Sequence, residues 1–167
     1  MKEYHFNLPL LQSDIEMLSA GDKVYLSGEV FTARDVVHAR LETLIQNDQS
    51  LPFNLATACI FYCGPSPTPA GKICGAIGPT TSARMDKYTP LLLEHGLRVM
   101  IGKGNRSEEV KQAIIDYGAV YFVCIGGASA LLSQSVVSRE TFMWDDLGAE
   151  AIHRLIVRDL PAYVAIV

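Results

Sequence analysis

The sequence lacks the cysteine patterns that bind metals. It contains four cysteines, none of which forms a C-x-x-C pair or lies with histidines at the spacing of a zinc site. No three of them are closely spaced, so we do not expect this chain alone to hold an iron–sulfur cluster. Cys59, Cys74 and Cys124 lie in apolar runs, and we expect them to be small buried side chains.

Targeting segments and strong positive charge are also missing. The first residues, MKEYHFNLPLLQSD, contain no apolar run of the kind found in secretory signals, so we expect a cytoplasmic protein. The net charge of −4 argues against a nucleic-acid partner, which usually requires a basic face. The longest uncharged stretch, residues 117–138, holds three glycines and four serines, which favours a strand, a turn and a helix over a membrane span.

The composition suits one domain with a substantial core. The chain has 167 residues, of which 49% are hydrophobic and 19% are charged. We therefore predict a single domain over residues 1–167. From periodicity and turn residues, we expect a helix at 11–18, a strand at 23–27 ended by Gly28, a helix at 34–46 and a strand at 55–62.

A repeated pattern in the middle of the chain indicates an α/β fold. Three apolar runs, 73–77, 99–101 and 120–125, each end at a glycine, and these glycines are 24 residues apart. A small-residue turn and a predicted helix follow each run, and Gly96 and Gly118 end the first two helices. Such strand–glycine turn–helix units place parallel strands side by side, so the three turns should meet at the edge where α/β sheets bind ligands.

The first glycine turn, GPTTSARMD at residues 78–86, is the richest in candidate binding groups. Hydroxyl side chains open a helix there, and the free N–H groups of a first helical turn attract anions. Arg84 lies one helical turn beyond Thr80, so both can face one ligand, and an arginine fork matches a carboxylate. A hydroxyl helix cap beside a solvated arginine would explain the same residues.

The other two glycine turns and one helix start carry weaker signals. Lys103 lies between two glycines in GKGNRS, which is not a Walker loop and could also be an exposed turn. Gly127 belongs to a turn whose bare N–H groups suit an anion or close packing. Arg34 and His38 share a face of the first long helix, where Asp35 could orient His38 or cap the helix. Together these groups predict a receptor for a small dianion.

Four segments resemble one family, the β-type part of class I fumarases and tartrate dehydratases. They occur in that family's order and are TARDVVH (32–38), GPTTSARMD (78–86), GKGNRS (102–107) and LGAEA (147–151). The resemblance implies an α/β fold of the swivelling β/β/α type, built from strand–glycine turn–helix units. It also implies a hydro-lyase whose [4Fe–4S] cluster is held by three cysteines of a separate α subunit, in an α2β2 assembly. Ala83, Ser129 and the end at Val167 depart from many members.

The resemblance also assigns expected roles to individual residues. Arg34 and Arg84 would hold the substrate carboxylates, Lys103 would add a third positive contact, and Thr81 and Gly127 would complete the binding set. Thr80 would lie near the carbon that loses its proton, and His38 would take a catalytic or supporting role. A threonine hydroxyl is a poor base unless its surroundings change its pKa.

Three functions remain open on the sequence alone. The lysine-bearing turn looks more like fumarases, so fumarate and malate are preferred and L(+)-tartrate comes second. A non-catalytic anion-binding or scaffold domain is the alternative from another class. A scaffold would not need the positive side chains of Arg34, Arg84 and Lys103, all of which are present.

Overall fold

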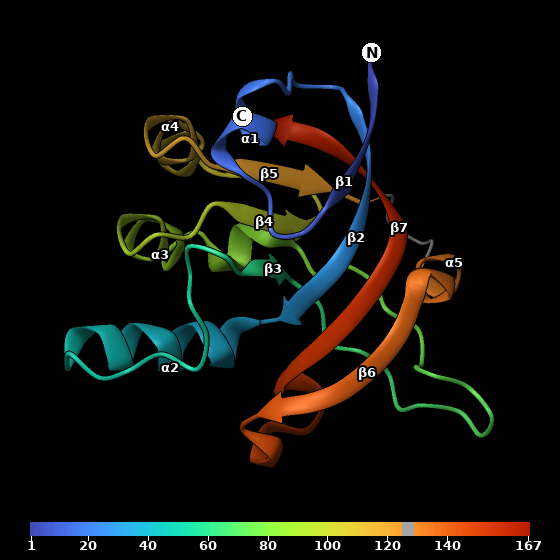
Figure 1. Cartoon of the computed structure of the whole chain (residues 1–167). Helices are drawn as coiled ribbons and strands as arrows, with labels where there is room; N and C mark the ends of the chain where they lie inside the picture. Colours follow the sequence, from blue (N-terminus) through green and yellow to red (C-terminus); the bar gives the residue numbers. More distant parts are fainter. Residues whose placement is uncertain (125–128) are drawn as a thin grey trace.

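The computed structural model describes residues 1–124 and 129–167, and its described part is a mixed α/β fold around one sheet (Figure 1). The strands are β1 (Glu3–Asn7), β2 (Lys23–Thr32), β3 (Cys59–Phe61), β4 (Val99–Gly102), β5 (Val120–Val123), β6 (Val136–Met143) and β7 (Ile152–Ile166). The α-helices are α1 (Gln12–Glu16), α2 (Asp35–Gln46), α3 (Thr89–Glu94), α4 (Glu108–Asp116) and α5 (Ser129–Leu132). Short 3-10 helices are η1 (Ser82–Met85), η2 (Ser133–Ser135) and η3 (Asp145–Glu150).

The sheet closes on itself through the long last strand. Its order is β1-β2-β3-β4-β5-β7-β6, and β2 also pairs with β7, so β2, β3, β4, β5 and β7 form a ring. Neighbouring strands from β1 to β5 are parallel, whereas β7 runs antiparallel to β2, β5 and β6. In Figure 1, β7 (red) runs beside β2 (blue) and continues towards β5. Closure gives the ring strands neighbours on both sides.

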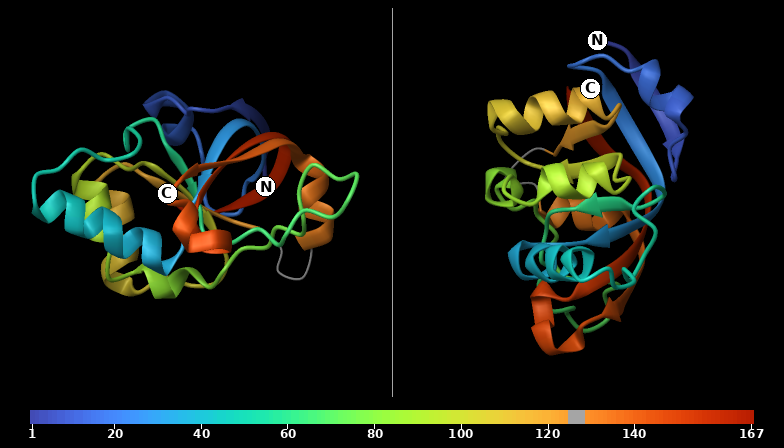
Figure 2. Two further views of the ribbon diagram at one scale, coloured as in Figure 1. Left: turned by 90° about the horizontal axis from the view of Figure 1, so that it is seen from below. Right: turned by 90° about the vertical axis from the view of Figure 1, so that its left-hand side faces the viewer.

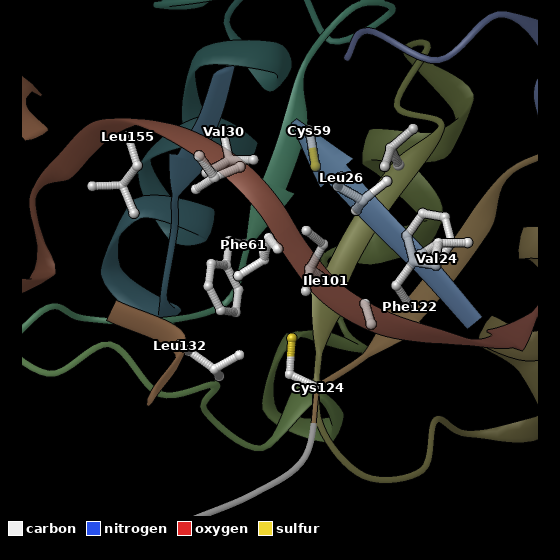
Figure 3. Packing of buried hydrophobic residues seen from close by; sticks show 14 of the residues in the cluster. Val24, Leu26, Val30, Cys59, Phe61, Ile101, Phe122, Cys124, Leu132 and Leu155 are labelled. Atoms are coloured by element: carbon white, nitrogen blue, oxygen red, sulfur yellow. The ribbon is translucent and has the colours of Figure 1, made fainter. Parts of the chain in front are cut away.

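Alternating side chains of the ring strands build two hydrophobic cores. Every second residue along these strands faces the interior of the ring, where the side chains drawn in Figure 3 from β2, β3, β4, β5 and β7 meet. The next residue faces the helices, as Ile60, Met100 and Tyr121 do. Helices α2, α3 and α4 cover that outer face in tiers, as the right-hand view of Figure 2 shows. Burial of each large side chain contributes roughly 1.5–3 kcal/mol.

The helix boundaries follow local sequence signals. Ser107 caps α4, since its hydroxyl oxygen accepts a hydrogen bond from the Val110 N–H at 3.2 Å. Gly96 and Gly118 follow α3 and α4 with φ of +113° and +64°, as expected for glycines just beyond a helix end. These helix ends confirm the expectation from the sequence.

The structure corrects the predicted threefold repeat. Residues 73–77 form no strand, and the place beside β4 is taken by β3. The apolar run is nevertheless packed, because Cys74 and Ile77 are buried. Its backbone bonds to loop and helix atoms, with the Ser66 N–H donating to the Ala76 carbonyl oxygen and the Ile77 N–H to the Ser129 carbonyl oxygen. The apolar sequence of residues 73–77 therefore reflects burial in a loop, although it resembles the sequence of a strand.

Gly28 does not end a strand, contrary to the sequence prediction. Strand β2 continues to Thr32, and its register against β7 shifts between Leu26 and Gly28. Gly28 has φ of +131°, and a Cβ there would lie 3.0 Å from the Leu8 Cβ. The glycine thus marks an irregularity inside a continuous strand. Within the described residues, no helix has the length and apolar content needed to traverse a membrane.

Candidate functional site

The predicted binding segments meet at one edge of the sheet, which we call the carboxyl rim, where β2, β3 and β4 end. Arg34 lies just beyond β2, and Lys103 directly follows β4. The segment 78–86, here called the threonine segment, returns to the end of β3, where the Thr80 N–H donates to the Tyr62 carbonyl oxygen at 2.6 Å. Because these strands are parallel, their carboxyl ends lie together.

The threonine segment pairs directly with residues 102–107, here called the lysine turn. Thr81 and Lys103 form an isolated parallel bridge. The Ser82 N–H donates to the Lys103 carbonyl oxygen, and the Lys103 N–H donates to Ser82 Oγ, both at 3.0 Å. A Cβ on Gly102 would overlap Ser82 Oγ, so only glycine permits this approach.

Arg34 lies at the start of α2 against two chain segments. Its Nε is 3.8 Å from Glu150 Oε1. A Cβ on Gly64 would lie 3.0 Å from Arg34 Cδ, so the absence of a side chain there makes room for the arginine. Glu150 ends η3, and η3 is attached to α2 by the Arg40–Asp146 ion pair at 2.7 Å. The LGAEA motif is thereby held beside Arg34.

Arg84 forms an ion pair with Asp35, the first residue of α2. Since Asp35 follows Arg34 in the chain, this pair brings the threonine segment to the same part of the carboxyl rim as Arg34. The Arg84 side chain remains 53% exposed. Both arginines therefore have a carboxylate partner, and Arg84 is open to solvent.

His38 is buried beneath this rim. Its Nδ1 lies 2.8 Å from the Arg34 carbonyl oxygen. Because a carbonyl oxygen can only accept, Nδ1 carries the proton and Nε2 is bare, with no hydrogen-bond partner among the described residues. Burial is the largest cause that lowers the pKa of His38 to about 4; the positive charge of Arg106 acts in the same direction, and the Arg34 carbonyl and Asp35 oppose it. This geometry favours support of the Arg34 backbone by a neutral His38.

The two threonines and the third turn complete the predicted set. Thr80 is half-buried and Thr81 is exposed on the carboxyl rim. Gly127 lies outside the described residues. The described start of α5 lies beside the threonine segment, since a Cβ on Gly78 would be 2.8 Å from the Ser129 Cβ. The rim therefore extends from Arg34 to the beginning of α5.

The cysteines do not fit a cluster ligand set. All four are buried free thiols, and burial raises the pKa of Cys124 to about 12 and that of Cys59 and Cys63 still further. Metal ligation requires the thiolate form. Within residues 1–124 and 129–167, no three histidine, cysteine or acidic side chains are grouped to hold a metal ion.

Sequence reasoning missed the acidic partners of the arginines. Asp35 was considered only as a cap or a partner of His38, whereas it pairs with Arg84. Glu150 lies in a motif to which the sequence assigns no role, and nothing in the local sequence around Gly64 indicates its contact with Arg34. The LGAEA motif was the available signal for Glu150, but its distance in sequence from Arg34 concealed the contact.

Comparisons with known proteins show which family this chain resembles. A family model described as "Fumarase C-terminus" matches residues 1–167. The chain is 40% identical over 146 residues to "Fumarate hydratase class I, anaerobic" of Escherichia coli, covering 86% of this chain and 27% of that protein. It is 35% identical over 158 residues to "Fumarate hydratase 2" of Leishmania major, covering 93% and 28%.

A third relative has nearly the length of this chain. "Putative L(+)-tartrate dehydratase subunit beta" of Methanocaldococcus jannaschii is 36% identical over 169 aligned residues. That match covers 98% of this chain and 86% of the relative. The chain thus spans less than a third of the two fumarate hydratases but most of the subunit-sized relative.

Proposed function

Because this chain belongs to the fumarase C-terminal family, we propose that it is the substrate-holding β part of an iron–sulfur-dependent hydro-lyase that interconverts fumarate and malate. The observation that carries the proposal is the gathering of Arg34, Arg84 and Lys103 on the carboxyl rim from three separate segments. Two guanidinium forks and one ammonium group suit a small molecule with two carboxylates.

The acidic partners suggest how the arginines are kept ready. Glu150 and Asp35 neutralise Arg34 and Arg84 before substrate arrives. We propose that the substrate carboxylates take over these contacts, with Thr81, Lys103 and the Gly127 turn completing the binding site. Positive groups placed in advance stabilise the charge that develops on a carboxylate when the neighbouring carbon loses its proton.

Thr80 is our candidate for the group beside the reacting carbon. Its N–H donates to the Tyr62 carbonyl oxygen, which holds the Thr80 backbone at the end of β3. A threonine hydroxyl acts as a base only where its surroundings alter its pKa. Thr80 Oγ1 would therefore pass the proton on and would not keep it. His38 supports the Arg34 end of the site from below.

The cluster is proposed to belong to a partner. The chain's own thiols are buried and protonated, so this chain would contribute no ligand to a [4Fe–4S] group. The match to most of a subunit named as beta supports a separate α subunit, in an α2β2 assembly whose interface includes the carboxyl rim. The whole chain would then act as one swivelling β/β/α domain beside that subunit.

A second candidate substrate is L(+)-tartrate, with oxaloacetate as product. The specific observation in its favour is the near-full-length match to the tartrate dehydratase β subunit. The greater identity to the Escherichia coli fumarate hydratase, 40% against 36%, keeps fumarate and malate first.

Anaerobic reconstitution tests the proposal. The chain would be produced alone and together with an adjacently encoded protein that carries three widely spaced cysteines. We expect malate dehydration only in the combined sample, and the absorbance of the fumarate formed would measure it. Full activity of the chain alone would contradict the need for a partner, and tartrate turnover without malate turnover would establish the second candidate. A tight complex with no turnover of either acid would favour the scaffold alternative.

A further inference from the structure

Arg106 is a buried cation beneath the carboxyl rim that the proposed substrate contacts do not use. Its side chain is 0% exposed, although arginine is almost never fully buried without a paired charge. It lies at the end of the lysine turn, and its ion-pair partner Asp86 ends the threonine segment, with Arg106 Nε donating to Asp86 Oδ1 at 2.6 Å. The last charged residues of the two motifs therefore bind each other.

Arg106 donates a hydrogen bond from each of its three guanidinium nitrogens and contacts two aromatic rings. Nη2 donates to Thr89 Oγ1 at 2.8 Å, and Thr89 in turn donates to the Met85 carbonyl oxygen. The guanidinium carbon lies 5.2 Å from the Tyr62 ring centroid and 4.8 Å from that of Tyr121, so it packs against two aromatic rings. A group held by so many contacts has little freedom to move.

Asp86 extends this attachment to the backbone of the lysine turn. While Oδ1 accepts from Arg106, Oδ2 accepts from the Ser107 N–H at 2.8 Å. One carboxylate thus ties the threonine segment to two successive residues of the lysine turn. Asp86 also neutralises Arg106, so the pair adds little net positive charge to the rim, and its contribution is geometric.

Tyr121 connects the same pair of segments nearer to Lys103. Its hydroxyl oxygen lies 2.9 Å from the Gly104 carbonyl oxygen and 2.8 Å from Ser82 Oγ. The carbonyl can only accept, so the tyrosine proton goes to Gly104 and the Ser82 hydroxyl donates to Tyr121. Ser82 Oγ remains the acceptor for the Lys103 N–H. Ser82, which bonds to Lys103, is therefore itself held by Tyr121, and Tyr121 packs against Arg106.

We propose that Arg106 is a positioning residue: together with Asp86 and Tyr121, it holds the lysine turn against the threonine segment and so sets where Lys103 meets a substrate carboxylate. The structural half of this inference, that Arg106 holds the two segments together, is supported by the contacts above. The other half, its effect on substrate binding through Lys103, rests on the proposed function. Arg106 lies below the rim and acts through Lys103.

Hydrogen exchange of the full chain tests the structural half. Arg106→Lys keeps the charge but removes the planar fork and its multiple donors. We expect exchange of the Lys103 and Ser82 amides to accelerate by about tenfold or more relative to the most protected core amides. The matched control is Arg98→Lys. Arg98 is likewise an arginine that donates more than one hydrogen bond, in its case to carbonyl oxygens, and packs on a tyrosine. It precedes β4, at the opposite end of that strand.

Equal exchange at Lys103 and Ser82 in Arg106→Lys and in the wild type would overturn the inference. If Arg106→Lys does not fold, Tyr121→Phe provides a second variant, since it removes only the hydroxyl that touches Ser82 and Gly104. Acceleration confined to the same two amides supports the inference, and unchanged exchange there contradicts it.

A double-mutant cycle in the complex with the iron–sulfur partner tests the consequence. We expect Arg106→Lys to raise KM for malate about tenfold with a smaller change in kcat, and we expect this effect to disappear in the Lys103→Met background. Additive effects of the two changes would show that Arg106 acts by general stability and would refute positioning through Lys103. If the complex turns over neither acid, the proposed function fails, while the exchange experiment still decides the structural half.

Discussion

At the scale of single residues, Arg84 is the most accessible of the rim arginines. We expect Arg84→Ala to lower kcat/KM for malate roughly 100-fold or more, because a misplaced or missing carboxylate contact costs about that much. Stability should change by less than about 1 kcal/mol, since Arg84 and Asp35 form a half-exposed ion pair. Steady-state kinetics and urea unfolding measure both effects.

The matched control is Arg154→Ala. Arg154 also forms ion pairs, with Glu29 and Glu140, but neither partner belongs to the proposed substrate-binding set. Its loss should leave kcat/KM unchanged. Equal kinetic effects of the two variants would contradict the assignment of Arg84 to substrate.

His38 carries a pH prediction. The pKa of a free histidine is about 6.5, and burial lowers that of His38 to about 4 in the fold. The unfolded chain therefore binds the proton more readily below pH 6.5, and stability falls as the pH drops from about 6.5 towards 4. At pH 5 the loss from this group is on the order of 2 kcal/mol.

The non-titrating variant His38→Gln isolates this contribution. Its free energy of unfolding should decrease less between pH 7 and pH 5 than that of the wild type, as urea titrations at the two pH values would measure. His153, whose pKa burial also lowers, is present in both proteins and cancels in the comparison. Parallel losses in wild type and variant would show that His38 does not titrate abnormally.

At the scale of elements, the N-terminal cap of α4 is Ser107, the last residue of the lysine turn. Ser107→Ala removes the hydroxyl that accepts from the Val110 N–H, and we expect a loss of about 1 kcal/mol in unfolding free energy. The exposed loop residue Ser50 offers a control, for which Ser50→Ala should cost less than about 0.5 kcal/mol. Indistinguishable denaturation curves for the two variants would rule out the cap.

Helices were more predictable than strands for a local reason. Residues 34–46 were expected to be helical and α2 spans Asp35–Gln46, because an apolar stripe and turn residues are contained within the element. The run 73–77 had a strand's composition, but a strand exists only where a partner backbone accepts it, and β3 occupies that place. Likewise, the sequence around Gly28 does not indicate that Leu8 packs against this glycine.

At the scale of the whole molecule, β7 completes the ring. Leu160 on β7 is fully buried in the inner core, so Leu160→Ala should lower the unfolding free energy by about 2–5 kcal/mol through the cavity that it leaves. The exposed Leu131 serves as the control, since Leu131→Ala removes a side chain that is mostly in water. Urea unfolding would compare them, and a small loss at Leu160 would mean that β7 is not essential to the core.

The sequence by itself determined the family, the α/β class, most helices and the residues expected to bind a dianion. Those features depend on local spacing and on motifs that each occupy a few neighbouring positions. Only the tertiary structure decided that β7 closes the ring, that Asp35 and Glu150 face the two arginines, and that Arg106 joins the motifs from below. These are contacts between residues far apart in the chain, and packing, rather than local preference, selects which of the available partners meet.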